Sequence, residues 1–269
     1  MHAECWSRNQ LMENRSLRVS ILVPAFNEEK TIERVLNKLL ALPIQDREII
    51  VVDDGSTDAT GEVVQRLAAA RSEIKFFQQR KNLGKTSAVS RAISESTGDV
   101  LIVQDADLEY DPLEIPDVIG PILDGHADVV YGSRFLVKRA SRVLYYYHYL
   151  ANKFLTCLSN ILTNRNMSDI ETCYKAFRRE VIVPMQLCSR GFGMEVEITA
   201  MVCKTRARTY EVPISYYGRT YEEGKKIGTW DGVAAIWYIL YFNLVHPFTS
   251  SGRKYIQTVN NSLAVDRAD

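Results

Sequence analysis

Short apolar runs alternate, along the first half of the chain, with stretches whose apolar positions recur every three or four residues. Runs rich in Val, Ile and Leu are typical of buried strands, and the longer spacing predicts amphipathic helices. We expect strands over residues 19–24, 48–53, 74–78, 100–104 and 128–132. The alternation of strand and helix predicts an α/β fold with a mostly parallel central sheet and helices on both faces.

Polar segments directly follow four of these strands. They read PAFNE (24–28), DDGSTD (53–58), NLGK (82–85) and DADLE (105–109). Ligands of parallel sheets bind beyond the carboxyl ends of the strands. We therefore expect one crevice to use all four segments.

Three carboxylates stand at alternate positions in the fourth segment: Asp105, Asp107 and Glu109. Such carboxylates repel one another unless a cation or a proton lies among them. Oxygen ligands with no cysteine or histidine nearby favour Mg²⁺ or Mn²⁺, often completed by a substrate diphosphate. Taken alone, each segment also has a simpler interpretation, which is a solvated acidic loop, an N-cap or a strand-to-helix turn.

The composition narrows the class of protein only a little. The chain has 269 residues, of which 46% are hydrophobic, so we expect a globular protein. Its 33 basic residues equal its 33 acidic ones, so the net charge says nothing about partners. We expect no nucleic-acid partner. Five cysteines without a CxxC pair argue against disulfides or zinc and favour the cytoplasm. No apolar run reaches the ~18–20 residues of a membrane span, and the N-terminus lacks the apolar core of a secretory signal.

The second half of the chain contains a segment without acidic residues, from Val129 to Ser168. A helical apolar stripe over 144–161 favours a helix buried in the domain core, although the tyrosines at its start suit a membrane boundary. Each basic residue near an anionic membrane contributes roughly 1 kcal/mol to attachment. We expect peripheral contact with the cytoplasmic face of a membrane through Lys138, Arg139, Arg142 and the tyrosines at 145–147. The uncharged segment 232–248 is a second candidate for contact with a membrane, a membrane subunit or another copy of the chain.

The order of the four polar segments resembles that of the family 2 glycosyltransferases of GT-A fold. The resemblance covers about residues 19–135 and implies that Asp105 and Asp107 hold Mg²⁺ or Mn²⁺ against the diphosphate of a nucleotide sugar. The further residues that it implies for binding the nucleotide sugar are Pro24, Asn27, Glu28, Asp54, Lys85 and Ala106.

The second half resembles the dolichol-phosphate mannose synthases and related polyprenyl-phosphate glucosyltransferases. The resemblance rests on GSR (132–134), the basic helix, the turn at Asp169 and GFGMEVE (191–197). In those enzymes a third side chain also binds the metal, and Glu109 occupies that position. The segment CYKAFRRE departs from the usual SGFR, and the lysine-containing loop departs as well, so only Arg219 and Lys226 are carried over as phosphate-binding cations. Arg134 and Asp169 are the expected catalytic residues.

The expected reaction is an inverting transfer of mannose or glucose, from GDP-mannose or UDP-glucose, to a dolichyl- or undecaprenyl-type phosphate. A phosphate acceptor is already an anion near neutral pH, so Asp169 would orient groups or act as a weak base. The alternative is a family 2 enzyme with a hydroxyl acceptor, which requires a base such as Asp169 or Glu195. A nucleotide-binding regulatory protein without turnover is the third possibility.

The expected organisation has three parts. Residues 1–17 form a flexible arm, and residues 18–228 form the GT-A domain. Its nucleotide-binding half is 18–135 and its acceptor half is 136–228. Residues 229–269 form an apolar helix and a tail that contact a membrane or a subunit, or mediate a homo-oligomer.

Overall fold

The structure is a computed structural model that describes residues 17–136, 142–143, 145–191, 193–218 and 229–267. Most of the expected N-terminal arm therefore lies outside the described residues. Seven strands form one sheet in the order β3-β2-β1-β4-β6-β5-β7. They are β1 (Val19–Ala25), β2 (Arg47–Asp53), β3 (Ile74–Gln78), β4 (Val100–Val103), β5 (Val129–Ser133), β6 (Lys175–Arg178) and β7 (Thr209–Pro213).

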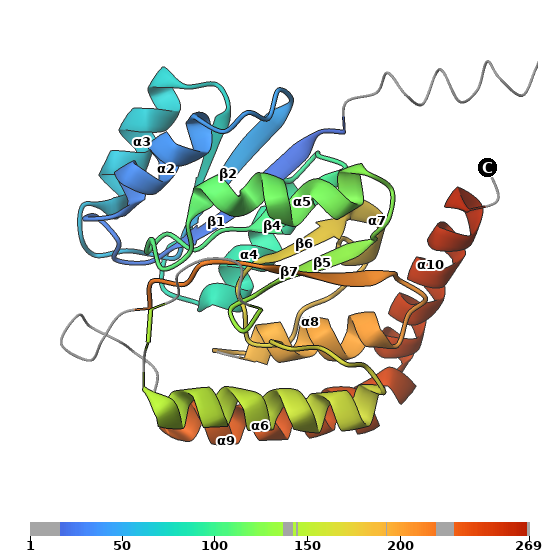
Figure 1. Ribbon diagram of the computed structural model, residues 1–269. Coiled ribbons are helices and arrows are strands. Elements are labelled where there is room, and N and C mark those ends of the chain that lie inside the picture. Colours follow the sequence, from blue (N-terminus) through green and yellow to red (C-terminus); the bar gives the residue numbers. More distant parts are fainter. Residues whose placement is uncertain (1–16, 137–141, 144, 192, 219–228, 268–269) are drawn as a thin grey trace, which may run out of the picture.

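Helices pack on both faces of this sheet (Figure 1). They are α2 (Ile32–Leu40), α3 (Thr60–Ala70), α4 (Lys85–Glu95), α5 (Ile115–Leu123), α6 (Tyr146–Thr163), α7 (Arg179–Ile182), α8 (Gly193–Cys203), α9 (Thr229–Leu244) and α10 (Ser250–Asp266). Two short 3₁₀ turns, η1 (Pro112–Glu114) and η2 (His246–Phe248), complete the described elements.

The central strands are parallel, as the apolar runs predict. Ile21 of β1 pairs with Ile49 of β2 on one side and with Ile102 of β4 on the other. The strand β6 is antiparallel to both β4 and β5, whereas β5 and β7 are parallel. The α/β fold with a mostly parallel sheet is thus confirmed, and the carboxyl ends of β1, β2, β3 and β4 point to the same edge of the sheet.

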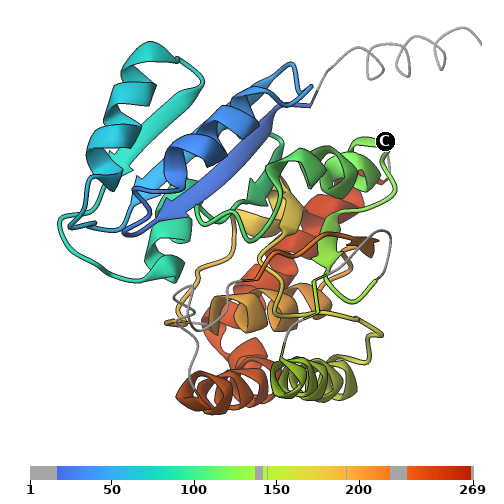
Figure 2. The same ribbon diagram turned by 60° about the vertical axis from the view of Figure 1, so that its left-hand side comes forward.

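The helix α8 is buried along its whole length. It lies between the sheet and the helices α6 and α9. These two helices lie side by side and are separated from the sheet by α8 (Figures 1 and 2). The contact with α9 is close at Gly193, because a Cβ there would lie 2.5 Å from the ring of Tyr238. Glu195 and Glu197 are therefore carried on a helix with no free face.

The helix α6 is not a core helix, and this corrects the interpretation of its apolar stripe. Phe154 and Ile161, both in the stripe, are largely exposed, and the buried positions of α6 are Leu155, Thr156 and Ser159. The physical reason is that α8 already covers the sheet, so α6 packs on α8 and α9 with one side only. The C-terminal segment forms two helices, α9 and α10, where the sequence pattern suggested one.

Candidate active site

The loops after β1 and β2 are tied together by their own motif residues. Asn27 donates its backbone N–H to Ser56 Oγ at 2.9 Å and accepts from the Thr57 N–H on Oδ1 at 2.9 Å. The backbone N–H of Glu28 donates to Thr60 Oγ1 at 2.8 Å. These bonds fix the shape of the two loops before any ligand is considered.

Asp54 ties the second loop to the third. It is 3% exposed, and its two carboxylate oxygens accept from the N–H groups of Leu83 and Gly84, both at 2.8 Å. The backbones of the two loops lie very close together here. Gly55 has a φ of +71°, and a Cβ on it would lie 2.6 Å from the Lys81 carbonyl carbon. Asp54 therefore holds the NLGK loop against the loop that follows β2. Its role in binding a nucleoside stays a prediction, as do the roles of Pro24, Asn27 and Glu28.

The DADLE segment begins where β4 ends and turns sharply. Ala106 is buried, Leu108 adopts a φ of +62°, and the Glu109 N–H donates to Asp107 Oδ1 at 3.0 Å. The Tyr216 hydroxyl donates to Glu109 Oε2 at 2.7 Å. A leucine in the left-handed region is uncommon and is typical of functional loops.

Within the described residues, the three carboxylates are not gathered into a group of three that would hold a metal ion. The expectation that Asp105, Asp107 and Glu109 all bind the metal therefore stays a prediction. The donor set still suits a hard divalent cation, because Mg²⁺ commonly takes one or two carboxylates and completes its shell with phosphate oxygens.

Lys85, the first residue of α4, bridges two carboxylates from different parts of the chain. Its Nζ lies 2.9 Å from Asp105 Oδ1 and 3.1 Å from Glu195 Oε1. Burial opposes the charge on Lys85, but Asp105 and the other nearby groups outweigh it and raise the pKa well above its ordinary value. Lys85 is thus an ammonium beside Asp105. Its expected role in binding the nucleotide sugar stays a prediction.

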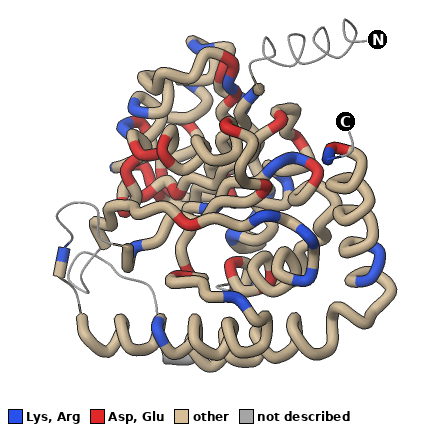
Figure 3. Tube along the Cα trace, turned by 45° about the vertical axis from the view of Figure 1, so that its right-hand side comes forward, with Lys and Arg blue, Asp and Glu red and all other residues tan. Residues whose placement is uncertain are grey.

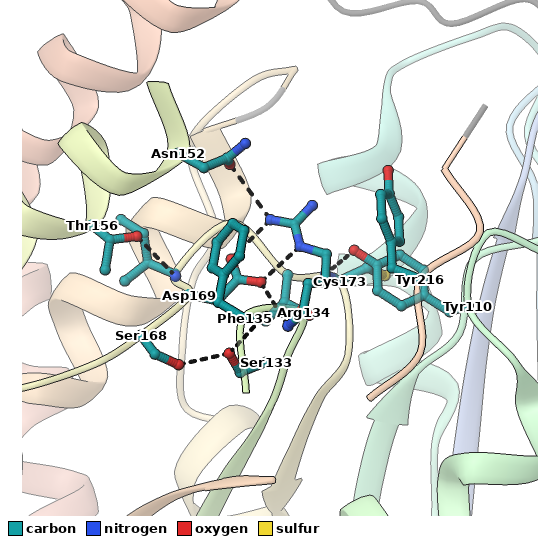
Figure 4. Close-up of polar contacts among 12 residues, drawn as sticks. Tyr110, Ser133, Arg134, Phe135, Asn152, Thr156, Ser168, Asp169, Cys173 and Tyr216 are labelled. Carbon is teal, nitrogen blue, oxygen red and sulfur yellow. Dashed lines mark hydrogen bonds and ion pairs between the residues drawn. The ribbon is translucent and has the colours of Figure 1, made fainter. Parts of the chain in front are cut away.

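Arg134 and Asp169, the two expected catalytic residues, form a fork-shaped ion pair (Figure 4). Arg134 Nε donates to Asp169 Oδ2 at 2.7 Å and Nη2 donates to Oδ1 at 2.8 Å. The Arg134 backbone N–H also donates to Oδ2, at 3.1 Å. Burial alone would raise the pKa of Asp169, but Arg134 outweighs this and holds the pKa below its usual value.

A carboxylate with a lowered pKa and both oxygens engaged is a weak base. The geometry therefore suits Asp169 to orienting Arg134. The arginine also stacks on an aromatic ring, with its Cζ 5.1 Å from the ring centre of Tyr216. Because Tyr216 in turn bonds Glu109, one ring joins Arg134 to the metal motif.

The helix α6 supplies two more polar groups that sequence reasoning did not assign to the site. Asn152 Oδ1 accepts from Arg134 Nη2 at 3.5 Å, and Lys153 Nζ lies 4.6 Å from the ring centre of Phe135. Lys153 also donates to the Ser168 carbonyl at 3.4 Å. Lys153 was noticed only as one of six basic residues, and Asn152 has no distinguishing pattern around it.

A half-buried acid, Glu171, and a buried base, Lys175, which follow Asp169 in the sequence, were also missed. Lys175 is 2% exposed and donates to the carbonyl oxygens of Ile170, at 2.9 Å, and Thr172. Burial, followed by the nearby Glu195 carboxylate, raises the pKa of Glu171 to about 7. The sequence ETCYK (171–175) could have indicated them, because it places an acid and a lysine beside an apolar strand.

The remaining expected cations fall outside the described residues. These are Arg219 and Lys226 of the lysine-containing loop, and Lys138 and Arg139 before α6. Arg142 is described, and its Nη1 donates to the carbonyl of Gly218 at 3.0 Å. This bond brings the start of the lysine-containing loop next to the segment that precedes α6.

Two known proteins are similar to this chain in sequence. Dolichol-phosphate mannosyltransferase of Pyrococcus furiosus is 32% identical over 79% of the chain and 60% of its own length. Undecaprenyl-phosphate 4-deoxy-4-formamido-L-arabinose transferase of Photorhabdus laumondii is 30% identical over 77% of the chain and 62% of its own length. The chain therefore spans about three fifths of the length of these relatives.

Solved structures share the fold. Glucosyl-3-phosphoglycerate synthase of Mycobacterium tuberculosis, in complex with Mn²⁺ and UDP-glucose, superposes with a TM-score of 0.63 and 21% identity, over 84% of this chain and 79% of that one. Its complex with Mg²⁺ and UDP gives the same values. The fold is thus the GT-A fold of glycosyltransferases. Residues 20–183 match the family described as glycosyl transferase family 2, and the chain belongs to that family.

Proposed function

We propose that the protein transfers a hexose from a nucleotide diphosphate sugar to a polyprenyl phosphate, with inversion and with the help of Mg²⁺ or Mn²⁺. One observation carries the proposal: Arg134 lies over Tyr216, and Tyr216 bonds Glu109 of the metal motif. A cation suited to an acceptor phosphate thus stands one aromatic ring away from the carboxylates suited to the donor. The names of the relatives, which are dolichol-phosphate and undecaprenyl-phosphate transferases, support this choice of acceptor.

At the donor end, Asp105 and Asp107 would hold the divalent cation. When bound, the cation neutralises the negative charge that develops on the departing diphosphate. The fold neighbours bound to Mn²⁺ or Mg²⁺ with UDP support this assignment. Lys85 adds a positive charge beside Asp105. The proposed donor is GDP-mannose or UDP-glucose.

At the acceptor end, Arg134 binds the phosphate and Asp169 keeps the guanidinium in place. The second ionisation of a phosphate monoester lies near ~6, so the acceptor is a nucleophilic dianion at neutral pH and needs no strong base. The lowered pKa of Asp169 agrees with this requirement. A hydroxyl acceptor would instead need a carboxylate that binds a proton readily.

A transfer assay with matched acceptors tests the proposal. GDP-mannose and UDP-glucose are each offered, with Mn²⁺, to a short polyprenyl phosphate and to the corresponding prenol, which lacks the phosphate. We expect product with the polyprenyl phosphate and none with the prenol. The rate should rise as pH increases through the second ionisation of the phosphate, near ~6. Transfer to a hydroxyl acceptor would favour the alternative family 2 activity, and donor binding without turnover would indicate a regulatory protein.

The outer side of α6 and α9 is the surface that we propose for membrane contact. Figure 3 shows that the tube along these two helices carries very little charge. Lys153 is the one lysine or arginine in the sequence of α6, and residues 232–244 of α9 contain no charged residue. The large exposed apolar side chains there are Tyr146, Tyr147, Tyr149, Leu150, Phe154, Ile161, Val233, Trp237, Leu240 and Leu244.

Tyrosine and tryptophan suit a boundary that is apolar on one side and wet on the other. Over the described residues, every helix falls short of the length and apolar character of a membrane span. A bilayer surface fits this face because a lipid acceptor must reach Arg134, and α6 supplies Asn152 to Arg134. Attachment is then largely apolar and changes little with salt, in contrast to the electrostatic contact expected of Lys138, Arg139 and Arg142.

Flotation with phosphatidylcholine and phosphatidylglycerol vesicles tests this surface. A Phe154→Glu, Trp237→Glu double variant is expected to bind vesicles at least tenfold more weakly, since burying each side chain contributes roughly 1.5–3 kcal/mol. Leu123→Glu, an exposed apolar position on α5, is the matched control and should float like the wild type. Unchanged flotation of the double variant contradicts the proposal. If the wild type forms a dimer without lipid and the double substitution dissociates that dimer, the surface instead contacts a second copy of the chain.

A further inference from the structure

Lys85 connects the two halves of the site by charge. Its ammonium lies 2.9 Å from Asp105 Oδ1, at the end of β4, and 3.1 Å from Glu195 Oε1, on α8. Asp105 is the first carboxylate of the metal motif. The group that a divalent cation would bind is therefore already paired with a cation of the protein itself.

We propose that Lys85 is a resident counter-cation of Asp105, which keeps the divalent cation weakly bound until a nucleotide diphosphate arrives. The inference rests on the proposed function, because it takes Asp105 as a metal ligand. It adds a dependence to binding: the divalent cation binds tightly only when the nucleotide diphosphate is present.

The electrostatics follow from the distances. The Lys85 ammonium lies 2.9 Å from Oδ1 and 3.1 Å from Oδ2 of Asp105, so it repels a divalent cation that approaches the same carboxylate. A diphosphate brings negative charge that attracts both cations, so it removes the repulsion and gives Lys85 a new partner. Metal affinity must then rise steeply when the diphosphate is present.

Glu195 lets Lys85 leave Asp105 without becoming an unpaired charge, which would be costly in a partly buried site. Glu195 is 5% exposed, its Oε1 faces Lys85, and its Oε2 is buried without a hydrogen-bond partner. Because α8 is buried along its whole length, this carboxylate is a fixed point. The ammonium can move between its two partners while Glu195 retains it.

Electron paramagnetic resonance of Mn²⁺ measures this directly, because the free ion has a strong signal that binding removes. Wild-type protein is titrated with Mn²⁺ alone, with UDP and with GDP. Lys85→Met is expected to bind Mn²⁺ about tenfold more tightly than the wild type without nucleotide, since one neighbouring charge typically shifts such an equilibrium by about one power of ten. The nucleotide should then increase Mn²⁺ affinity about tenfold less in the variant than in the wild type.

Two controls sharpen the result. Lys81→Met removes an exposed lysine of the loop that precedes α4 and should bind Mn²⁺ like the wild type, whereas Asp105→Asn should bind it poorly in all conditions. Equal Mn²⁺ affinities for Lys85→Met and wild type, with and without nucleotide, overturn the inference. A wild-type protein that transfers hexose without binding Mn²⁺ overturns it too, yet leaves the transfer function standing. Competition by Lys85 in a protein that transfers nothing supports the inference and contradicts the proposed function.

Discussion

The two halves of the site bury a carboxylate in different ways. In the half that we expect to bind the nucleotide, Asp54 is 3% exposed and accepts from two backbone N–H groups of the next loop. In the half that we propose for the acceptor, Asp169 is fully buried and is held by the side chain and backbone of Arg134. The first arrangement depends on the course of the main chain, and the second depends on one long side chain.

This difference separates structural support from chemistry. A carboxylate that accepts from backbone groups has its partners wherever the loops fold, so it stabilises the loops themselves. A carboxylate paired with arginine keeps a charged group ready to bind phosphate, and each member is costly to bury without the other. We expect substitutions in the two halves to differ in how they divide their effects between stability and transfer.

The largest effect is expected at the Arg134 and Asp169 pair. Arg134→Met leaves Asp169 buried and unpaired, so it should lower the free energy of unfolding by about 3–5 kcal/mol. Transfer should fall at least a hundredfold, because the acceptor phosphate loses its cation. The Arg134→Met, Asp169→Asn double variant should regain most of the stability and none of the transfer, as measured by denaturant unfolding and the transfer assay.

The same pair decides whether Asp169 acts as a base. If it only orients Arg134, Asp169→Asn retains part of the activity and keeps the pH dependence set by the acceptor phosphate. A base would give a different result: transfer would fall as far as in Arg134→Met, and the rise of the rate with pH would disappear.

A smaller effect is expected at Asp54. In Asp54→Asn, one side-chain oxygen is replaced by an NH₂ group that faces a backbone N–H, so a charge-assisted hydrogen bond worth about 1.5–3 kcal/mol is lost. Stability and nucleotide affinity should fall together, because the NLGK loop loosens. Asp124→Asn, at an exposed position, is the control and should change stability by less than about 0.5 kcal/mol. Nucleotide affinity that falls without any loss of stability would show that Asp54 contacts the nucleotide itself.

The nucleotide-binding half was largely predictable from the sequence. The strands expected over 19–24, 48–53, 74–78 and 100–104 correspond to β1, β2, β3 and β4 within one or two residues. A continuous apolar run identifies a strand that is buried on both faces of a sheet, and the polar motifs follow these strands directly. Their meeting at one edge follows from parallel strand order alone.

The acceptor half was predictable only in part. Arg134 and Asp169 were both expected, but their pairing across 35 positions has no local signature. Lys85 and Glu195 are 110 positions apart, and their contact depends on how α8 packs beneath the sheet. The apolar pattern of α6 does not distinguish a core helix from one that rests on another helix, since both bury a stripe.

The last effect concerns the pH dependence of stability at Glu171. Burial and the Glu195 carboxylate raise the pKa of Glu171 from 4.5 to about 7. Lys175, Arg134 and Asp169 also act on it electrostatically. The folded protein therefore binds this proton more tightly than the unfolded chain does. Its stabilising effect is complete below about pH 4.5 and is lost as pH rises to about 7, where the folded protein also releases the proton.

Glu171→Gln removes this ionisation while keeping the size of the side chain. Between pH 5 and pH 8 the wild type should lose about 2–3 kcal/mol of unfolding free energy that the variant keeps, because each pK unit corresponds to 1.36 kcal/mol. Glu62→Gln, exposed on α3, should follow the wild type at every pH. Denaturant unfolding at a series of pH values measures the difference. Parallel stability curves for Glu171→Gln and the wild type would mean that Glu171 is ionised throughout, held by Lys175 in the same way that Arg134 holds Asp169.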